Sequence, residues 1–464
     1  MAESLEADAV VVGAGTSGGY FAWKLAEAGF RCLVVEGKSL DQLGEDIGPF
    51  HIEKVGFERS GIPLPSGEEL LHALEYITMW SPSGEHGITS RVPTMNMYKP
   101  LFMRRLHGYA REAGVEFLER TEFLEVIREG GFPGGLRARG ENGDLEIRSH
   151  LVVDASGIDG RVRTSMPSSP WLENDPVHDL DTLVVYMESW RDIVGDIEPD
   201  INSYLHAQGW YAPSVGEEII VGIGCPASPD AARNRHKAFA ATLPFAGEAS
   251  SVTIGRVPYR RPPYSLVDNG FMVVGDAAFM SKPFNGEGVV SALTACRIAA
   301  EVAADALSRD DLSKEALWPY NLRYFRDQGS KFAFLMAVIP CLASLGEDEI
   351  EYLFTVPGLL TAEGTQVLNL EYELVSNPAD ALRVLLGIAR GVVGGKLSPR
   401  KLASIAEVGI AAARLKGFYE RYPEHPVEFG GWLRKVEPLW RGADEVKHDF
   451  MTGVMRECTQ AKGG

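Results

Sequence analysis

The sequence predicts an α/β protein in three parts: an open sheet of alternating strands and helices, a separate antiparallel sheet, and a C-terminal helical region. Three observations support this prediction. A buried strand, a glycine-rich turn, a helix and a second buried strand follow one another over residues 9–36. Short apolar segments typical of strands cluster over 182–224. Beyond residue 310 the spacing of apolar residues is mostly helical.

The three parts divide the 464 residues into a discontinuous first domain, an inserted sheet and a helical remainder. A chain of this length suffices for two or three structural units. The expected boundaries are 1–165 with 264–310 for the open sheet, 166–263 for the antiparallel sheet, and 311–464 for the helical region.

Local patterns predict the individual elements in chain order. For the open sheet they are a strand over 9–12, a helix over 16–28, a strand over 31–35, a helix over 100–113, a hairpin over 118–139 and a strand over 151–154. For the antiparallel sheet they are strands over 182–188, 209–212 and 219–224. A buried strand over 271–274 and a helix over 288–304 then return to the first domain. Residues 40–95 are rich in Gly, Pro and Ser and give mixed signals.

The net charge and the cysteines argue against several classes of protein. The formal net charge of −19 disfavours general nucleic-acid binding, which needs a clustered basic surface. The cysteines are far apart and form no Cys-x-x-Cys pair, so a disulfide framework, a zinc site or an iron–sulfur cluster is not expected. They are Cys32, Cys225, Cys296, Cys341 and Cys458.

The N-terminus and the apolar runs predict a cytoplasmic protein. Residues 1–9 are acidic and lack the basic start and the apolar run of a signal peptide. The best candidate for a membrane span, 332–345, is too short and contains Pro340. Peripheral contact with a membrane stays open.

The first motif, Gly13-Ala14-Gly15-Thr16-Ser17-Gly18, lies between the first strand and the first helix. Gly13 permits a tight turn, Gly15 lets the backbone approach a pyrophosphate, and Gly18 lets helix and strand pack closely. The phosphates then face the positive end of the helix. Glu36, at the end of the second strand, is placed to accept hydrogen bonds from a ribose. The pattern predicts a Rossmann-type dinucleotide site; the alternative is an ordinary glycine-rich turn.

Two further motifs favour FAD over NAD as the dinucleotide. Residues 151–157 form a strand that ends in Asp-Ala-Ser-Gly, and residues 271–278 form a strand that ends in Gly-Asp-Ala-Ala. Asp276 in the second strand is placed to accept hydrogen bonds from the ribityl chain. The turn over 283–288 then begins a helix, whose N–H groups and dipole would stabilise negative charge at N1 and O2 of a reduced flavin.

With these motifs in order, the chain resembles the glutathione-reductase-type FAD fold, in the branch shared by aromatic hydroxylases and geranylgeranyl reductases. The Asp-Ala-Ser-Gly strand end, the Gly-Asp-Ala-Ala motif and the Pro-x-x-Gly-Glu-Gly turn are more similar to the geranylgeranyl reductase family. The resemblance covers about residues 7–310. It implies a Rossmann-type FAD-binding domain, an antiparallel-sheet substrate domain and oxidoreductase activity.

The chain departs from the family pattern at three places. Lys99 stands where the family usually has an arginine, and a lysine contacts a phosphate or ribityl oxygen as a point charge. The segment 44–49 lacks the cysteine that many members carry. The aromatic–proline signature appears only loosely over 209–213, where Trp210 and Tyr211 either line an apolar substrate tunnel or are ordinary core aromatics.

The residues expected to bind the cofactor are Gly13, Gly15, Thr16, Ser17, Gly18, Glu36, Lys99, Ala155, Gly275, Asp276, Pro283, Gly286 and Gly288. The first functional hypothesis is an FAD-dependent reductase of carbon–carbon double bonds in an isoprenoid or another apolar substrate. The hydride chemistry belongs to the cofactor, and a protein acid or water supplies the proton. His51 and Tyr211 are candidates for that acid, and the alternative for each is a structural role.

Two other reaction classes are alternatives. Asp159-Gly160 resembles the hydroxylase signature, which favours a flavin-dependent monooxygenase. A halogenase is disfavoured, because no Trp-x-Trp-x-Ile-Pro occurs. An electron-transfer flavoprotein that reduces a quinone is the third hypothesis. No second Gly-x-Gly-x-x-Gly follows a strand and opens a helix, so the expected electron donor is a transiently docked NAD(P)H or a ferredoxin.

A basic and apolar segment, 382–421, stands out in this acidic chain. It has two acidic residues, Glu407 and Glu420. Its eight basic residues are Arg383, Arg390, Lys396, Arg400, Lys401, Arg414, Lys416 and Arg421. This composition suits an anionic membrane, a lipid headgroup or an acidic electron carrier. The alternative is the solvated basic face of a packed helix.

Overall fold

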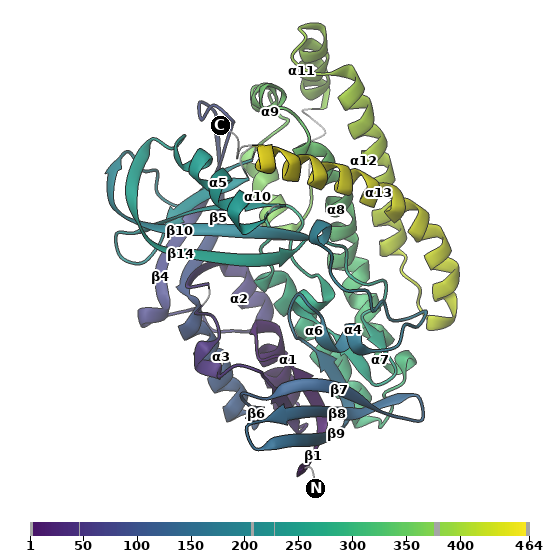
Figure 1. Ribbon diagram of the computed structural model, residues 1–464. Helices are drawn as coiled ribbons and strands as arrows, with labels where there is room; N and C mark the ends of the chain where they lie inside the picture. The colour runs from purple at the N-terminus through teal and green to yellow at the C-terminus, as the bar shows by residue number, and fades with distance from the viewer. Residues whose placement is uncertain (1–2, 46, 206–207, 227, 375–380, 461–464) are drawn as a thin grey trace.

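The computed structural model describes residues 3–45, 47–205, 208–226, 228–374 and 381–460. Figure 1 shows two sheets, one at the end of the molecule where β1 begins and one beside the end of α13, with the later helices stacked along one side. The predicted combination of an α/β domain, a second sheet and a C-terminal helical region is confirmed.

The first sheet is parallel at its centre, and its strands have the order β15–β16–β9–β1–β2–β6. Val10 pairs with Leu33 on one side and Val152 on the other, and all three are buried. Strands buried on both faces have continuous apolar sequences, which is why these were predictable. Their bounds are β1 Glu3–Val12, β2 Cys32–Val35, β6 Glu116–Leu118, β9 Gly143–Asp154, β15 Val267–Asp268 and β16 Phe271–Val273.

A hairpin and three helices complete the first domain. The hairpin strands β7 (Glu122–Glu129) and β8 (Phe132–Gly140) continue antiparallel from β9, as predicted. Helices α1 (Thr16–Glu27) and α6 (Val289–Ser308) pack against each other, and α3 (Lys99–Glu112) packs against α1.

The second sheet has the strand order β14–β10–β13–β12–β11–β4–β5–β3 and is antiparallel except where β11 runs parallel to β4. The strands predicted within it lie in β10 (Thr182–Gly195), β12 (Gly209–Pro213) and β13 (Ile219–Cys225). The others are β3 Pro49–Glu53, β4 Leu70–Trp80, β5 Gly87–Tyr98, β11 Ile201–Tyr204 and β14 Phe245–Pro258. Helix α5 (Pro229–Ala240) packs against β10 and β13.

The predicted domain boundary does not follow sheet membership. Residues 1–165 were assigned to the first domain, but β3, β4 and β5 are hydrogen-bonded into the second sheet. Many side chains of β4 and β5 are exposed or half-exposed, so these strands lack the continuous apolar runs that marked the first sheet. Their sequence therefore gave no clear pattern.

The C-terminal region is helical, as predicted, and α8 packs against α12 and α13. Within the described ranges, no single helix is long and apolar enough to cross a membrane. Two consecutive helical segments, Lys314–Ala343 and Glu347–Phe354, meet the criteria of length and composition when taken together. The chain bends by 113° between them. The helices are α7 Lys314–Tyr324, α8 Ser330–Ala343, α9 Glu347–Phe354, α10 Ala362–Glu371, α11 Ala381–Val393, α12 Pro399–Glu420 and α13 Pro426–Gln460.

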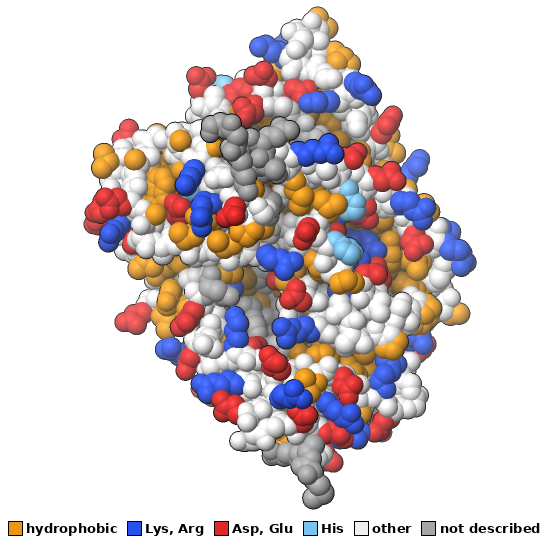
Figure 2. Space-filling model, viewed as in Figure 1, with side chains coloured by type: hydrophobic (Ala, Val, Ile, Leu, Met, Phe, Trp, Pro, Cys, Tyr) orange, Lys and Arg blue, Asp and Glu red, His pale blue; other side chains and the backbone are white. Residues whose placement is uncertain are grey.

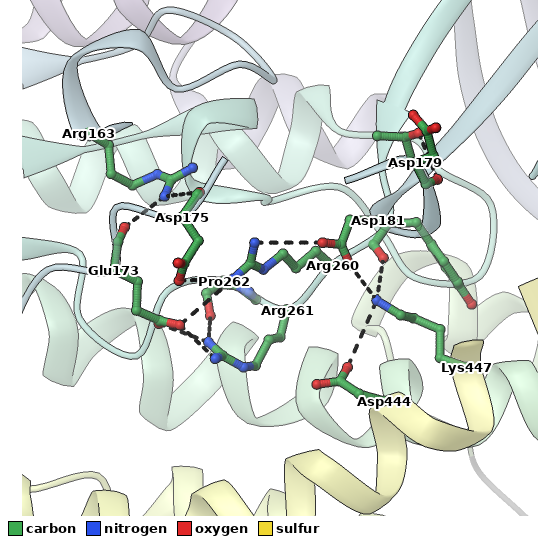
Figure 3. A network of polar contacts seen from close by, with 12 residues as sticks. Arg163, Glu173, Asp175, Asp179, Asp181, Arg260, Arg261, Pro262, Asp444 and Lys447 are labelled. Carbon is green, nitrogen blue, oxygen red and sulfur yellow. Dashed lines mark hydrogen bonds and ion pairs between the residues drawn. The ribbon is translucent and has the colours of Figure 1, made fainter. Parts of the chain in front are cut away.

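An ionic junction ties α13 to two of the connections between the sheets (Figure 3). Lys447 on α13 is buried and lies 2.7 Å from Asp181, just before β10. Arg261, after β14, lies 2.7 Å from Glu173. Burial acts to raise the pKa of Asp181, but Lys447 and then Arg260 outweigh it and hold that pKa below its usual range. The junction therefore joins three segments that are distant in the sequence.

Candidate flavin site

The glycine turn has the geometry of a dinucleotide-binding loop. Gly13 has φ +103°, and a Cβ there would collide with the carbonyl oxygen of Ala155. A Cβ on Gly18 would collide with the carbonyl oxygen of Gly13, so α1 and the turn are in backbone contact. A Cβ on Gly15 would meet nothing within 4 Å. Gly13 and Gly18 are thus needed for packing, whereas Gly15 faces open space.

The N-terminus of α1, where Thr16 and Ser17 begin the helix, suits an anion. Gly15 is the N-cap, and no side chain within the described chain caps this end. The first N–H groups of a helix without a cap can bind a phosphate, and the helix dipole favours its charge. Thr16 Oγ1 lies 3.5 Å from Met103 Sδ, while Ser17 packs against Gly275.

Glu36 lies directly beside the turn. Its carboxylate accepts hydrogen bonds from the Ala14 N–H at 2.9 Å and from the Lys38 N–H at 2.9 Å. A carboxylate has about four lone-pair positions, so two remain for the hydroxyls of a ribose. The predicted position of Glu36 next to the pyrophosphate loop agrees with this geometry.

The second motif supports the turn from behind. Ala155 donates its N–H to Val12 at 2.9 Å and packs against Gly13 and Gly18. The buried carboxylate of Asp154 accepts hydrogen bonds from the Ser156 hydroxyl at 2.6 Å and from the Arg163 N–H at 2.7 Å. Asp154 therefore holds the strand end together, a role that the sequence analysis missed.

Lys99 and Asp276 come from distant segments, and the fold brings the Lys99 ammonium close enough to act electrostatically on the Asp276 carboxylate. Lys99 begins α3, and Asp276 follows β16 in a short turn that Gly275 starts with φ +65°. Burial raises the pKa of Asp276, and the ammonium of Lys99 acts in the opposite direction. The hydroxyl of Ser281 lies 3.5 Å from the same carboxylate. A cation and an acceptor in one place fit the predicted contacts with a ribityl chain and a phosphate.

The turn before α6 differs from the expectation in one respect. Pro283 is buried, Gly286 has φ +74°, and Gly288 is the N-cap of α6, as the motif predicts. However, the Glu287 carboxylate accepts hydrogen bonds from the Val289 N–H at 2.6 Å and from the Val290 N–H at 3.2 Å. The chain itself thus satisfies N–H groups that were expected to face the flavin. An acidic residue at the start of a helix was the signal for this cap.

His51 is a poor candidate for the proton donor. Its Nε2 is buried without a hydrogen-bond partner in the described structure. Burial, with a smaller contribution from His72, lowers the pKa of His51 to about 4. The imidazole is therefore neutral at neutral pH, and it can hydrogen-bond but has no acidic proton to give.

Trp210 and Tyr211 lie on β12 and point to opposite faces, as alternation along a strand requires. Tyr211 is buried in an aromatic cluster with Tyr204 and Phe245, whose ring centroid lies 4.9 Å away. Burial raises the pKa of Tyr211. Trp210 packs over Gly222, where a Cβ would meet its ring. Tyr211 is thus a core aromatic, and Trp210 is the one that stays half-exposed.

No group of three or more His, Cys, Asp or Glu side chains in the described part of the chain is placed to hold a metal ion. The site instead combines a glycine turn with open backbone at Gly15, the carboxylate of Glu36, and the Asp276 carboxylate under the electrostatic influence of Lys99. Those groups fit a dinucleotide with a ribityl chain.

Comparison with known proteins agrees with this geometry. No protein-family model matches the chain. The chain is 27% identical over 454 residues to a digeranylgeranylglycerophospholipid reductase of Sulfolobus acidocaldarius, which covers 94% of this chain and 97% of that protein. The geranylgeranyl bacteriochlorophyll reductase-like protein of Thermoplasma acidophilum has a TM-score of 0.71 at 20% identity, over 87% of this chain and 100% of that one.

A second similar structure belongs to another reaction class. The myxobacterial chondrochloren halogenase, a FAD-dependent halogenase, has a TM-score of 0.58 at 19% identity over 89% of this chain and 97% of that one. The fold is therefore shared by a reductase-like protein and an FAD-dependent halogenase. The resemblance to geranylgeranyl reductases that the motifs predicted is confirmed by the sequence similarity, and the fold is that of flavin-dependent enzymes.

Proposed function

We propose that the protein binds FAD non-covalently and reduces carbon–carbon double bonds of isoprenoid chains carried on a glycerophospholipid. The observation that carries this proposal is the similarity to a digeranylgeranylglycerophospholipid reductase over 94% of the chain. The arrangement of the glycine turn, Glu36, Lys99 and Asp276 supports it independently, because these groups match the successive parts of a flavin dinucleotide.

The residues of this chain would bind and orient the cofactor, which supplies the hydride when reduced. The open backbone at Gly15 and the uncapped end of α1 receive the pyrophosphate, and Glu36 receives the adenosine ribose. Lys99 and Asp276 hold the ribityl chain. Water or a group other than His51 supplies the proton, because the imidazole is neutral. The half-exposed Trp210 is the aromatic we assign to the apolar substrate.

The electrons come from NAD(P)H that docks transiently or from a ferredoxin. The described fold shows one glycine-rich dinucleotide turn, which FAD occupies in this proposal. Each donor predicts a different behaviour. Reduction by NAD(P)H alone saturates with its concentration, whereas reduction by ferredoxin slows as salt screens the charges between the two proteins.

The experiment for this proposal has two steps. Heating the purified protein should release a yellow flavin that chromatography identifies as FAD. The FAD-loaded protein, reduced without oxygen and mixed with a digeranylgeranyl glycerophospholipid, should yield lipid whose mass rises by two hydrogens per double bond. FMN as the only flavin, or lipid of unchanged mass, would contradict the proposal.

A flavin-dependent monooxygenase is the second candidate, because the fold also matches an FAD-dependent halogenase and a probable FAD-dependent monooxygenase. Asp159 lies near Arg256 on β14, with 3.8 Å between the charged groups, in the segment that resembles the hydroxylase signature. This candidate predicts rapid reoxidation by air coupled to oxygen insertion. A quinone-reducing flavoprotein predicts rapid reoxidation by a soluble quinone and none by the lipid.

We also propose that α11 and the start of α12 contact an anionic membrane surface, where such a lipid resides. The apolar residues of α11 are unusually exposed: Leu382 is 67% exposed, Leu385 66% and Val393 90%. In Figure 1, α11 lies at one extremity of the molecule, and Figure 2 shows hydrophobic and basic side chains together there. Two of the eight basic residues are partly neutralised, because Lys401 pairs with Glu349 and Lys416 with Glu373.

Vesicle sedimentation tests this contact. Each basic residue near an anionic bilayer contributes about 1 kcal/mol. Changing Arg390, Lys396 and Arg400 to Gln should therefore release the protein from anionic vesicles at low salt. Changing Arg120, Arg137 and Arg139, exposed at the opposite end of the molecule, is the matched control and should leave binding unchanged. Equal binding by both variants would show that α11 does not contact the membrane.

A further inference from the structure

A buried ionic triad is built into the turn that begins α6. Lys282 immediately precedes Pro283, and its ammonium lies 2.5 Å from Glu53 and 2.7 Å from Glu287. The side chain of Lys282 is 0% exposed, that of Glu53 is 6% exposed and that of Glu287 is 18% exposed. One cation thus faces two carboxylates, so the fully ionised triad carries a net charge of −1.

This charge is poorly compensated. Oε2 of Glu53 is buried and has no hydrogen-bond partner within the described chain. Burial, reinforced by Glu53 and opposed by Lys282, raises the pKa of Glu287. Burial acts to lower the pKa of Lys282, but the two carboxylates raise it, so the lysine keeps its proton. If the triad takes up a proton, one of the carboxylates therefore receives it.

The other charged groups around the triad do not supply the missing cation. The ring of Tyr372 lies 5.4 Å below the ammonium, and burial raises the pKa of Tyr372 to about 12, so the phenol is neutral. Arg59 on α2 (Lys54–Ser60) also acts electrostatically on Tyr372, but it lies 2.8 Å from Glu371, which neutralises it. The triad and the groups around it therefore carry a net negative charge when all three side chains are ionised.

The position of the triad relates it to the flavin site. Glu287 belongs to the predicted cofactor turn, and its carboxylate caps α6 through Val289 and Val290. By contrast, α1 has no side-chain cap, which leaves its positive end to the phosphates. The dipole of α6, expected to stabilise a reduced flavin, is thus partly offset by an acidic side chain of the same chain. A negative cluster next to a cofactor that gains negative charge is unfavourable unless a proton accompanies the electrons.

We propose that the Glu53–Lys282–Glu287 triad is a proton-storing group of the flavin site, which takes up one proton when the flavin is reduced and releases it when the flavin is reoxidised. The inference rests on the proposed function. Reduction delivers two electrons and one proton to the flavin, and the triad binds a second proton from solvent. On reoxidation the hydride leaves for one alkene carbon, the other carbon gains a proton, and the triad returns to its ionised form. The proton count of the two stages then balances.

The test is the pH dependence of the midpoint potential of the bound flavin, measured on the alkaline side of neutrality. Each proton taken up shifts a two-electron equilibrium tenfold per pH unit, which is about 30 mV. The wild-type protein should show the two-proton slope, about 60 mV per pH unit. Glu53→Gln leaves one carboxylate for one ammonium, so it should show the one-proton slope and a higher potential. Glu58→Gln, a change of an exposed carboxylate on the neighbouring α2, is the matched control and should behave as wild type.

The outcomes separate this inference from the proposed function. A one-proton slope in the wild-type protein overturns the triad's role whether or not Glu53→Gln folds. A two-proton slope that persists in Glu53→Gln also overturns it. Lipid of unchanged mass together with a two-proton slope overturns the proposed substrate and leaves the triad's role intact. A protein that binds no flavin overturns both.

Discussion

The glycine turn of the first sheet and the ionic junction beneath α13 both gather polar groups at strand ends, but their groups have different partners. In the turn, Gly15 faces open space and Glu36 keeps unused acceptor capacity. In the junction, Lys447 and Asp181 are paired with each other and buried. The difference teaches that a site for a ligand shows unused hydrogen-bonding capacity, whereas a structural cluster has used it. Variants in the turn should therefore change cofactor affinity, and variants in the junction should change stability.

The largest expected effect belongs to the junction. Lys447→Met keeps the apolar stem but removes the buried ammonium, which leaves the Asp181 carboxylate buried without its main partner. Breaking such a pair costs about 3–5 kcal/mol. Urea unfolding at neutral pH should show this loss, because the pKa of Asp181 is lowered in the folded protein and its contribution is present above the unfolded value. That contribution disappears as the pH falls through the folded pKa.

The control for this variant is Lys435→Met, at an exposed position on the same helix. It should leave the free energy of unfolding within about 0.5 kcal/mol of wild type. Equal stability of Lys447→Met and Lys435→Met would show that the buried ammonium contributes nothing to the stability of the fold.

Glu36→Ala should give the next largest effect, on FAD affinity. The variant removes a charged acceptor next to the predicted ribose position, which is worth about 1.5–3 kcal/mol. Asp276→Ala should weaken FAD binding by a similar amount through the ribityl chain. Titration of the apoprotein with FAD measures both, and Glu122→Ala, at an exposed position, is the control. Unchanged affinity in both variants would show that the two carboxylates have been assigned wrongly.

Two glycines of the turn, Gly15 and Gly18, separate an effect on cofactor binding from an effect on stability within a single motif. Gly18→Ala places a methyl group against the Gly13 carbonyl and should destabilise the apoprotein by about 1–3 kcal/mol. Gly15→Ala meets nothing in the protein, so it should leave the apoprotein's stability unchanged and weaken FAD binding. Thermal unfolding without FAD, followed by FAD titration, distinguishes the two. Loss of stability in Gly15→Ala would contradict the role of its open backbone.

His51→Gln should have the smallest effect. Glutamine keeps hydrogen-bonding capacity, so the expected cost to lipid reduction is about 1 kcal/mol or less. The folded pKa of about 4 lies below the ordinary value, so wild-type stability is full above about pH 6.5 and falls as the pH drops toward 4. In the variant, the free energy of unfolding should decrease less over this pH range. Urea unfolding at a series of pH values measures the difference. Abolished reduction with FAD still bound would instead identify His51 as essential to the chemistry.

The sequence predicted the first sheet well because its information is local. Strands buried on both faces are continuous apolar runs, and the turn from Gly13 to Gly18 lies within six residues. The strands β4 and β5 were not predicted, because their half-exposed faces mix polar and apolar residues. Glu53 gave no signal either, since its partner Lys282 lies 229 positions away. Contacts of that kind are set by the topology of the two sheets.

The candidate site shows the same division. Glu36, Gly275 and Asp276 could be assigned from motifs, while the approach of Lys99 to Asp276 required the fold. The Glu287 cap could have been found from its place at the start of a helix, but the expectation of a ligand there obscured it. His51 was chosen by position in the chain, and burial shows it to be neutral.

Under the proposed function, the reduced flavin of this protein transfers hydride to a polyprenyl lipid. The most direct measurement is rapid mixing of the anaerobically photoreduced protein with digeranylgeranyl glycerophospholipid, a soluble quinone or air, while flavin absorbance is followed. We expect rapid reoxidation by the lipid with saturated product, and slower reoxidation by quinone and by air. Rapid reoxidation by air with a peroxyflavin spectrum, and none by the lipid, would contradict it.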